Sequence, residues 1–393
     1  MELPKIIEIE KMYESIKPEI EGLNRFVYDH PELGLEEYES ARAHARLLES
    51  HGFSVEMPYL GMATSFRAEF DTKRAGRNIA FLSEYDALPG IGHGCGHNIL
   101  GASTTGAGIL LSKLLPKGKV TVIGTPAEET LGGKVILANG GAFADVHGVY
   151  CTHPDNEWYS SGHSLAMESV EFRFHGKTAH ASTQPEEGIN ALEGVLLLFH
   201  NINAIRQTFT SLQRVTGIIK DGGEAANVIP DFACARFHIR AASRKDLAAL
   251  SARIRQCAAA AAMAIGCRLD TVHYEETFLD LRTNRAMSRL FDETIGELGV
   301  EMVPFTGNPG SLDMGNVSYQ VPSANPSFKI SNGHHHSLHT AEFRDLTITP
   351  TALENMGKTV ITMAKCAWEI MADDGLYGEI YEEFINNVVN APN

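Results

Sequence analysis

The spacing of hydrophobic residues in the first part of the chain predicts alternating helices and strands. From Ile6 to Glu49 apolar residues recur every three or four positions, with a break at Asp29-His30-Pro31, so we expect two helices joined by a turn. Shorter apolar runs and further helical spacing predict strands at 53–57, 65–70, 78–82 and 120–125 and helices at 101–115 and 132–139. This alternation predicts an α/β sheet with helices on its faces.

The pattern changes after Val149-Tyr150. The next segment predicts, in order, a strand at 170–175, a helix at 189–208, a strand at 236–240 and an Ala-rich helix at 247–265. Such an order is typical of a small α+β domain inserted into the sheet domain. We therefore expect a discontinuous domain of residues 1–165 and 280–393, ending in a helix at 351–371, and an inserted domain of residues 166–279.

Length and composition agree with two soluble globular domains. The chain has 393 residues, of which 44% are apolar and 21% are charged, and a domain usually has about 100–200 residues. The formal net charge is −16 at pH 7, whereas binding to a phosphate backbone depends on clustered Lys and Arg. We therefore expect no nucleic-acid partner.

No segment of the sequence predicts insertion into a membrane. The first residues lack the basic start and apolar stretch of a signal peptide, and no apolar run approaches the roughly 18 residues that a membrane helix needs. The six cysteines are widely spaced, without the pattern of a disulfide framework. We expect a cytoplasmic protein with reduced thiols and no membrane partner.

The segment Gly94-Cys95-Gly96-His97 places a thiol and an imidazole in a Gly-rich turn after a predicted strand. Thiolate and imidazole suit a borderline-soft metal, and the flanking glycines would allow both side chains to converge on one point. A buried cysteine and a hydrogen-bonded histidine in a tight turn would produce the same residues. The segment alone therefore leaves both alternatives open.

Further candidate ligands follow other predicted strands. Glu128-Glu129 comes directly after the strand at 120–125, at the carboxyl end where sites form in α/β sheets. One carboxylate could bind a metal while its neighbour acts as general base, although adjacent glutamates usually belong to a solvated surface. His153 also follows an apolar strand, and His339 lies in a polar segment near the end of the chain. Each histidine alone is more often structural, but all these donors together predict a metal site.

Six segments then form an ordered set along the chain. They are His30-Pro31-Glu32-Leu33-Gly34 with Glu36-Glu37, Asp86-Ala87-Leu88-Pro89, Gly94-Cys95-Gly96-His97-Asn98, Pro126-Ala127-Glu128-Glu129, Gly176-Lys177-Thr178-Ala179-His180 and Asn227-Val228-Ile229-Pro230. In this order they resemble the M20 metallopeptidase and amidohydrolase family, particularly the branch of aminoacylase-like carboxypeptidases, p-aminobenzoyl-glutamate hydrolases and dipeptidases. The resemblance extends over nearly the whole chain.

The resemblance implies a dinuclear metal site. It implies that two divalent ions, such as zinc, manganese or cobalt, are held by Cys95, His97, Glu129, His153 and His339. It further implies that Glu128 is the general base and that Asp86 orients a metal ligand.

The same resemblance implies the fold and the substrate-binding residues. The first domain would be an aminopeptidase- or carboxypeptidase-like α/β domain with helices on both faces of a mixed sheet, and the insertion a ferredoxin-like α+β lid and dimerisation domain. In that insertion His180 would polarise the scissile carbonyl, while Asn227 and Arg240 would grip the substrate. A homodimer or a larger homo-oligomer is expected.

Some residues depart from the family pattern. Glu84 stands where distant relatives have a histidine ligand, and Asn98 replaces an aspartate, which favours the hydrolase and dipeptidase side of the branch. Leu312 removes a hydroxyl group from a segment of that side, and His334-His335-His336 could bind metal or belong to a loop near His339. Both features bear on the choice of substrate.

These residues predict an enzyme that hydrolyses the amide bond of a small substrate with a free carboxylate. Dipeptides, N-acyl amino acids and aminobenzoyl-glutamate-like conjugates all fit. One alternative is a catalytically silent metal- or peptide-binding relative of the same fold, although the chain keeps the expected base Glu128. Another is a thiol redox protein, although Cys95 has no partner in a Cys-x-x-Cys motif.

Overall fold

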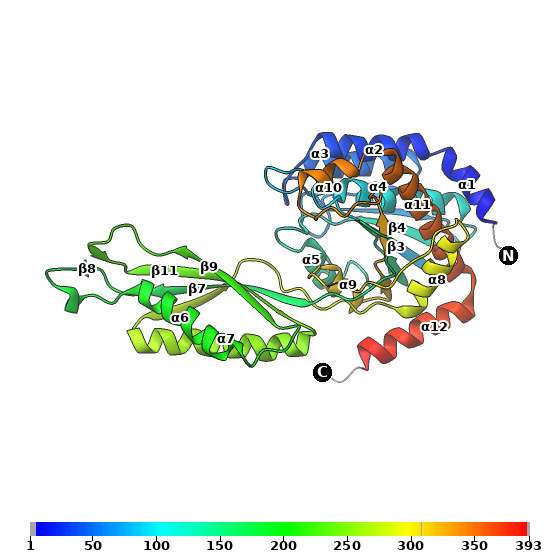
Figure 1. Ribbon diagram of the computed structural model, residues 1–393. Coiled ribbons are helices and arrows are strands. Elements are labelled where there is room, and N and C mark those ends of the chain that lie inside the picture. Colours follow the sequence, from blue (N-terminus) through cyan, green and yellow to red (C-terminus); the bar gives the residue numbers. More distant parts are fainter. Residues whose placement is uncertain (1–4, 308, 391–393) are drawn as a thin grey trace. The chain divides into compact units, whose positions relative to one another are not determined.

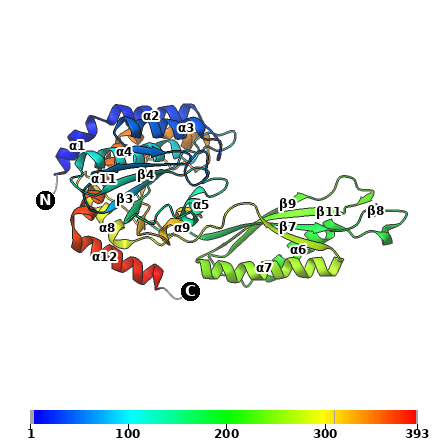
Figure 2. The ribbon, with the colours of Figure 1, turned by 180° about the vertical axis from the view of Figure 1, so that it is seen from behind.

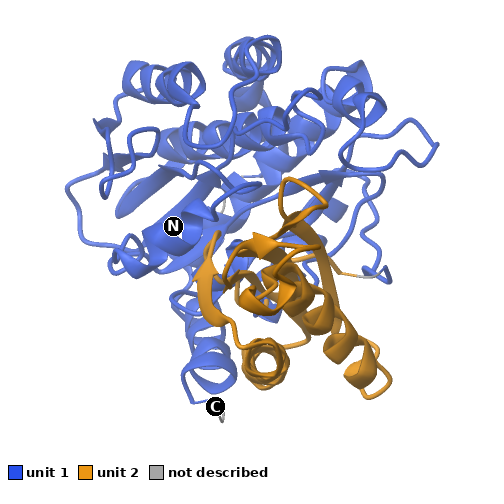
Figure 3. Cartoon of the chain, turned by 90° about the vertical axis from the view of Figure 1, so that its left-hand side faces the viewer, with its two compact units in different colours: residues 1–163, 281–308, 313–392 blue, residues 164–280, 309–312, 393 orange. Residues whose placement is uncertain are grey.

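A computed structural model describes residues 5–307 and 309–390, and these form two compact units. The first unit contains residues 5–163, 281–307 and 313–390, and the second contains residues 164–280 and 309–312 (Figure 3). Each unit has a hydrophobic core of its own.

The first unit is built on a six-stranded mixed sheet with the strand order β1-β2-β4-β3-β5-β13. β2 pairs antiparallel with β1 and β4, whereas β4, β3, β5 and β13 run parallel. The bounds are β1 Ser54–Glu56, β2 Phe66–Asp71, β3 Asn78–Ser83, β4 Lys119–Gly124, β5 Gly148–Tyr150 and β13 Ser323–Ala324. A short parallel pair, β6 (His153–Asp155) and β14 (Ser327–Lys329), extends from the same region.

Helices cover this sheet. The bounds are α1 Ile6–Glu14, α2 Lys17–Asp29, α3 Tyr38–Ser50, α4 His97–Leu114, α5 Gly133–Asn139, α8 Arg285–Gly296, α9 Met314–Ser318, α10 Ala341–Leu346, α11 Pro350–Ala372 and α12 Asp374–Phe384. Figures 1 and 2 show α4 and α11 together over one face of the sheet, and α8 packs against α11 and, through Phe291, against Tyr150 of β5. The mixed α/β fold expected from the sequence is therefore confirmed.

Helix α4 packs unusually closely on the sheet because small residues face it. A β-carbon at Gly108 would lie 2.3 Å from Cγ2 of Val122 in β4, and one at Gly101 would lie 2.3 Å from the carbonyl oxygen of Glu84. Only glycine permits such an approach. The N-terminus of α4, at His97, is thereby fixed directly beside the end of β3.

The N-terminal helical region corrects one prediction. Two helices were expected between Ile6 and Glu49, but the structure has three, because α1 ends at Glu14 and α2 begins at Lys17. Pro18 lies in the first turn of α2. Proline is tolerated there but lacks the N–H that a helix interior requires, so one continuous helix cannot pass through it.

The second unit is a four-stranded antiparallel sheet with the order β12-β7-β11-β9. Its strands are β7 Ala166–His175, β9 Arg214–Asp221, β11 Phe232–Ala241 and β12 Arg268–His273, and its helices are α6 Ala191–Arg206 and α7 Arg244–Ile265. The helices pack on the sheet around Phe172, Phe174 and Phe237. A two-residue pair, β8 (Ala179–His180) and β10 (Val228–Ile229), forms a separate small ribbon.

β9 and β12 were not predicted from the sequence. Both are edge strands, and every residue of β9 except Val215 is exposed. A strand exposed in this way does not carry the alternation of buried and polar residues on which a prediction depends. None of the helices in the described ranges is both long enough and apolar enough to span a bilayer.

Candidate functional site

The candidate site lies where three parallel strands end. Glu84 and Asp86 follow β3, Glu128 and Glu129 follow β4, and His153 follows β5. Because β4, β3 and β5 are parallel neighbours, their carboxyl ends meet at one edge of the sheet. Pairing of the strands thus gathers residues that are far apart in the sequence.

Cys95 and His339 reach this edge from other loops. Gly96, the residue between Cys95 and His97, has φ of +83°, which glycine adopts without steric cost. The N–H of His339 donates to the carbonyl oxygen of Gly94 at 2.9 Å, and this hydrogen bond holds the two loops together.

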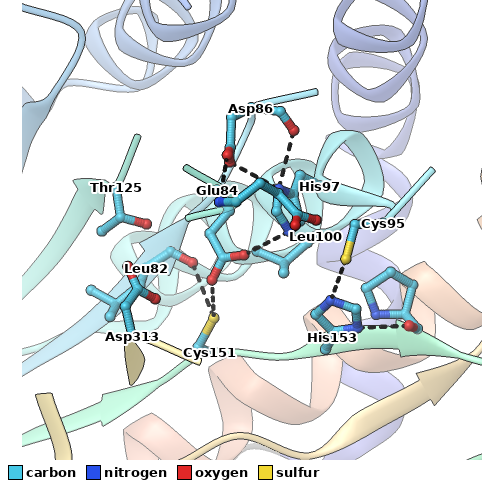
Figure 4. Close-up of polar contacts among 12 residues, drawn as sticks. Leu82, Glu84, Asp86, Cys95, His97, Leu100, Thr125, Cys151, His153 and Asp313 are labelled. Carbon is cyan, nitrogen blue, oxygen red and sulfur yellow. Dashed lines mark hydrogen bonds and ion pairs between the residues drawn. The ribbon is translucent and has the colours of Figure 1, made fainter. Parts of the chain in front are cut away.

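Ligand atoms of six side chains form three overlapping groups, and within each group all atoms lie within 4.8 Å of one another. Cys95 belongs to two groups and His97 to two, so the groups are contiguous. In the first, Sγ of Cys95 lies 3.4 Å from Nε2 of His153 (Figure 4). The groups are Cys95-His97-His153, Cys95-Glu129-His339 and His97-Glu128-Glu129.

The ring of His97 is oriented by Asp86. Nδ1 of His97 donates to Oδ1 of Asp86 at 2.9 Å and to its carbonyl oxygen at 3.1 Å, as Figure 4 shows. Both atoms are acceptors, so the ring proton resides on Nδ1 and the lone pair of Nε2 points into the donor cluster. This is the usual arrangement of a histidine that binds metal through the other nitrogen.

Among the residues that the structure describes, two buried atoms in the cluster have no hydrogen-bond partner of good geometry. They are Nε2 of His97 and Oε1 of Glu129. Oε2 of Glu84 lies 3.1 Å from Nε2 of His97, and Nε2 of His339 lies 3.3 Å from Oε1 of Glu129. Neither pair has the directions of a hydrogen bond. Buried polar atoms are nearly always paired, so these two fit the ligand positions of a cation.

The electrostatic environment also fits a cation. Burial raises the pKa of the Cys95 thiol well above its usual range, and Glu129 raises it further although His97 opposes this. Burial lowers the pKa of His97, but Asp86, Cys95 and Glu84 outweigh it and raise that pKa well above its usual value. A divalent ion would supply the positive charge that a thiolate needs at this position.

Burial, followed by the charges of Asp313, Glu84 and Glu129, raises the pKa of Glu128 well above its ordinary value. Burial raises the pKa of Glu129, but the neighbouring His339 and the positive charge of His97 outweigh burial and lower that pKa. The adjacent carboxylates thus differ in character: Glu129 favours the charged form and Glu128 can hold a proton.

A fully buried lysine adjoins the site and was not found by sequence reasoning. Nζ of Lys134, in the first turn of α5, lies 2.7 Å from Oε1 of Glu84 and 2.6 Å from Oδ1 of Asp313. Burial lowers the pKa of Lys134, but Asp313, Glu84 and Glu128 raise it well above its usual value. Glu84 is therefore an anion paired with Lys134.

The remaining residues that the sequence predicted as functional lie in the second unit. His180 in β8 pairs with Val228 of β10, and the carbonyl oxygen of Asn227 accepts the N–H of Ala181 at 3.0 Å. The side chains of His180 and Asn227 are exposed at this ribbon. Arg240 lies in β11, where burial lowers its pKa although Glu275 and Tyr274 oppose this. The structure brings His180 and Asn227 together within this unit, and the roles of all three stay predictions.

Residues 166–265 match the M20 peptidase dimerisation domain family. Over 386 aligned residues the chain is 33% identical to the Xaa-Arg dipeptidase of Mus musculus, covering 92% of this chain and 88% of that protein. It is 32% identical to one of the p-aminobenzoyl-glutamate hydrolase polypeptides of Escherichia coli, covering 91% of this chain and 90% of that protein.

Two solved structures share the fold at low sequence identity. An aminobenzoyl-glutamate utilization protein from Klebsiella pneumoniae aligns with a TM-score of 0.73 and 20% identity over 91% of this chain and 97% of that one. A dinuclear metal-binding peptidase of the M20 family from Bacillus subtilis aligns with a TM-score of 0.68 and 20% identity, over 91% and 99% of the two chains.

We predict that Lys134→Met strongly destabilises the first unit. The change leaves the carboxylates of Glu84 and Asp313 buried without their cation, which costs about 3–5 kcal/mol of unfolding free energy. Urea denaturation measures this. Lys358→Met is the matched control, because the ion pair that Lys358 forms within the described part of the chain is a helical i,i+4 pair with Glu354, and its loss should change stability by less than about 0.5 kcal/mol. Equal stability of the two variants would contradict the buried ion cluster.

Proposed function

This chain belongs to the M20 family of metallopeptidases, and on that basis we propose that it hydrolyses the amide bond of a small substrate carrying a free carboxylate. It is a metallo-amidohydrolase, in agreement with its dipeptidase and aminobenzoyl-glutamate hydrolase relatives. The observation that carries the proposal is the overlap of three donor groups at one sheet edge, one of which includes Glu128, whose pKa is raised.

Five of the clustered side chains would hold two divalent ions, namely Cys95, His97, Glu129, His153 and His339. Thiolate, imidazole and carboxylate are ligands of zinc, and the carboxylate and imidazole also suit manganese or cobalt. Cys95, His97 and Glu129 each belong to two of the donor groups, so the groups form one continuous set of donors. Bound ions of this kind make water more acidic and polarise a carbonyl group.

Glu128 acts as general base and then as general acid. Its carboxylate takes a proton from the attacking water, holds it, and delivers it to the nitrogen of the leaving amine. The raised pKa of Glu128, caused first by burial and then by Asp313, suits a group that must carry a proton between two steps. Asp86 supports this chemistry by fixing the orientation of His97.

Three residues of the second unit serve the substrate. His180 donates to the carbonyl oxygen of the scissile amide, and Asn227 holds the substrate beside it. Their exposure on the β8–β10 ribbon supports this role. Arg240 binds the free carboxylate through its planar guanidinium, which can form two parallel hydrogen bonds.

The second unit also makes the protein a homodimer or a larger homo-oligomer. The match of residues 166–265 to a dimerisation domain supports this. β9 is an open edge strand on which the side chains of Ile218 and Ile219 are exposed. Such an edge with apolar side chains can pair with another chain.

A hydrolysis screen tests the proposed activity. We expect the enzyme, supplied with zinc, manganese or cobalt, to hydrolyse a member of one of three groups: dipeptides, N-acyl amino acids or aminobenzoyl-glutamate conjugates. Arg240→Ala should raise KM for that substrate about 10- to 100-fold, because a hydrogen-bonded charge is lost. The matched control is the same substrate as its carboxyl amide, for which the substitution should matter little. Release of product from none of the three groups would favour a catalytically silent relative.

The two adjacent glutamates should respond differently to substitution. Glu128→Ala should keep its metal content but lower kcat by about 100-fold or more, because the general base is lost. Glu129→Ala should lose bound metal, since a ligand is removed. Steady-state kinetics and metal analysis by mass spectrometry measure both effects. Near-normal activity of Glu128→Ala would show that another group is the base.

Oligomeric state tests the dimerisation proposal. Analytical ultracentrifugation should give a mass of at least two chains for the unsubstituted protein. Ile218→Lys should shift the mass toward one chain, because it places a charge on the open edge of β9. Met263→Lys is the control, because Met263 is a highly exposed apolar residue of α7, away from that edge. A monomeric unsubstituted protein would refute the proposal.

A further inference from the structure

The loop that carries Glu128 is held by a buried carboxyl group from a segment 90 positions earlier in the chain. Glu37 is fully buried, and its Oε1 accepts the backbone N–H of Ala127 at 2.8 Å. Its other oxygen, Oε2, accepts the hydroxyl of Thr64 at 2.8 Å. Both oxygens of this carboxyl group are thus committed.

Ala127 has a backbone conformation that needs such support. Its φ is +60°, in the left-handed region that residues with a β-carbon rarely adopt. The bend at this position turns the chain from the end of β4 toward the site, so the directions of Glu128 and Glu129 depend on it. A residue in a strained conformation keeps it only when the surrounding contacts determine it.

Gly34, in the same segment as Glu37, packs against this bend. A β-carbon at Gly34 would lie 3.1 Å from Cα and Cβ of Ala127 and 2.3 Å from Oγ1 of Thr130. The carbonyl oxygen of Ala127 in turn accepts the N–H of Gly132 at 2.8 Å. The segment at 34–37 therefore forms a close-fitting support for the loop.

Asp86 holds the other side of Glu128. Its Oδ2 accepts the backbone N–H of Glu129 at 3.0 Å, while its Oδ1 accepts from His97. The N–H groups immediately before and after Glu128 are therefore bound by carboxyl groups from two different segments. A backbone fixed on both sides leaves the Glu128 side chain few directions in which to point.

We propose that Glu37 is a positioning residue, which aims Glu128 at the reacting water by holding Ala127 in its left-handed conformation. The proposal rests on the proposed function of Glu128 as general base. It also assigns a role to the segment His30-Pro31-Glu32-Leu33-Gly34 with Glu36-Glu37, for which neither the metal ligands nor the substrate-binding residues account.

A carboxyl group at this buried position contributes little to the free energy of folding. Burial, and after it the charge of Asp86, raises the pKa of Glu37 to about 7. The ionised form is therefore disfavoured in the folded protein relative to the unfolded chain. The presence of a carboxyl group here is therefore better explained by the geometry it enforces than by the folding free energy it contributes.

Kinetics of two substitutions test the proposal. Glu37→Ala should lower kcat about 100-fold, the effect expected for a misplaced catalytic group, with KM and metal content nearly unchanged. Glu37→Gln should stay within about tenfold of normal kcat, because its amide oxygen can accept from Ala127 and its NH₂ group can donate to the hydroxyl oxygen of Thr64. The matched control is Glu36→Ala, since Glu36 is exposed and adjacent. An equal loss in the Gln and Ala variants would overturn the proposal.

A second substitution separates positioning from simple stabilisation. Glycine adopts positive φ without steric cost, so Ala127→Gly should restore part of the kcat that Glu37→Ala loses. If Glu37 only stabilised the fold, adding this flexible residue would lower kcat further. Partial recovery in the double variant therefore supports the proposal, and a further decrease contradicts it.

Hydrogen–deuterium exchange gives a readout that needs no turnover. In Glu37→Ala, peptides covering residues 126–132 should exchange faster, whereas those covering the β3 core should not. Unchanged exchange in this loop would overturn the proposal, as would faster exchange throughout the unit. Because exchange is independent of activity, failure of Glu128 as general base would leave this result intact and so be recognised separately.

Discussion

The site is dominated by the cost of burying several carboxyl groups side by side. Glu84, Asp86 and Asp313 are all buried at one sheet edge, with Glu128 and Glu129 partly buried beside them. Like charges in a region of low dielectric repel strongly unless cations or hydrogen bonds compensate them. The contacts around the site consist largely of cations and hydrogen bonds that offset these buried negative charges.

The buried carboxyl groups are compensated by different partners. Lys134 serves Glu84 and Asp313, while Asp86 is bound by the ring of His97 and the N–H of Glu129. The remaining negative charge, together with the unpaired nitrogen of His97, is what divalent ions would neutralise. Burial and then the same repulsion raise the pKa of Glu128, whereas His339 and His97 lower that of Glu129.

This arrangement requires exact placement of loops, and the sheet provides it. β4, β3 and β5 run parallel, so the loops after them share an edge, and the glycines of α4 let that helix approach β4 closely. Glu37 and Asp86 then fix the loop after β4 from both sides. The second unit has a hydrophobic core of its own.

The sequence by itself determined the alternating sheet of the first unit, the strand-helix order of the second, and the donors Cys95 and His97. It could do so because buried strands, amphipathic helices and Gly-rich turns leave local patterns. It missed the edge strands β9 and β12, and the break between α1 and α2, because local spacing there is ambiguous.

Only the tertiary structure brought Lys134 to Glu84 and Glu37 to Ala127. In the sequence Lys134 is an ordinary lysine near the start of a helix, and Glu37 is one of two adjacent glutamates. Nothing in local spacing distinguishes buried Glu37 from exposed Glu36, because burial depends on which distant segment packs over each side chain. Partnerships between residues 50 or more positions apart are set by packing of the whole sheet, and they decide which carboxyl groups act and which support them.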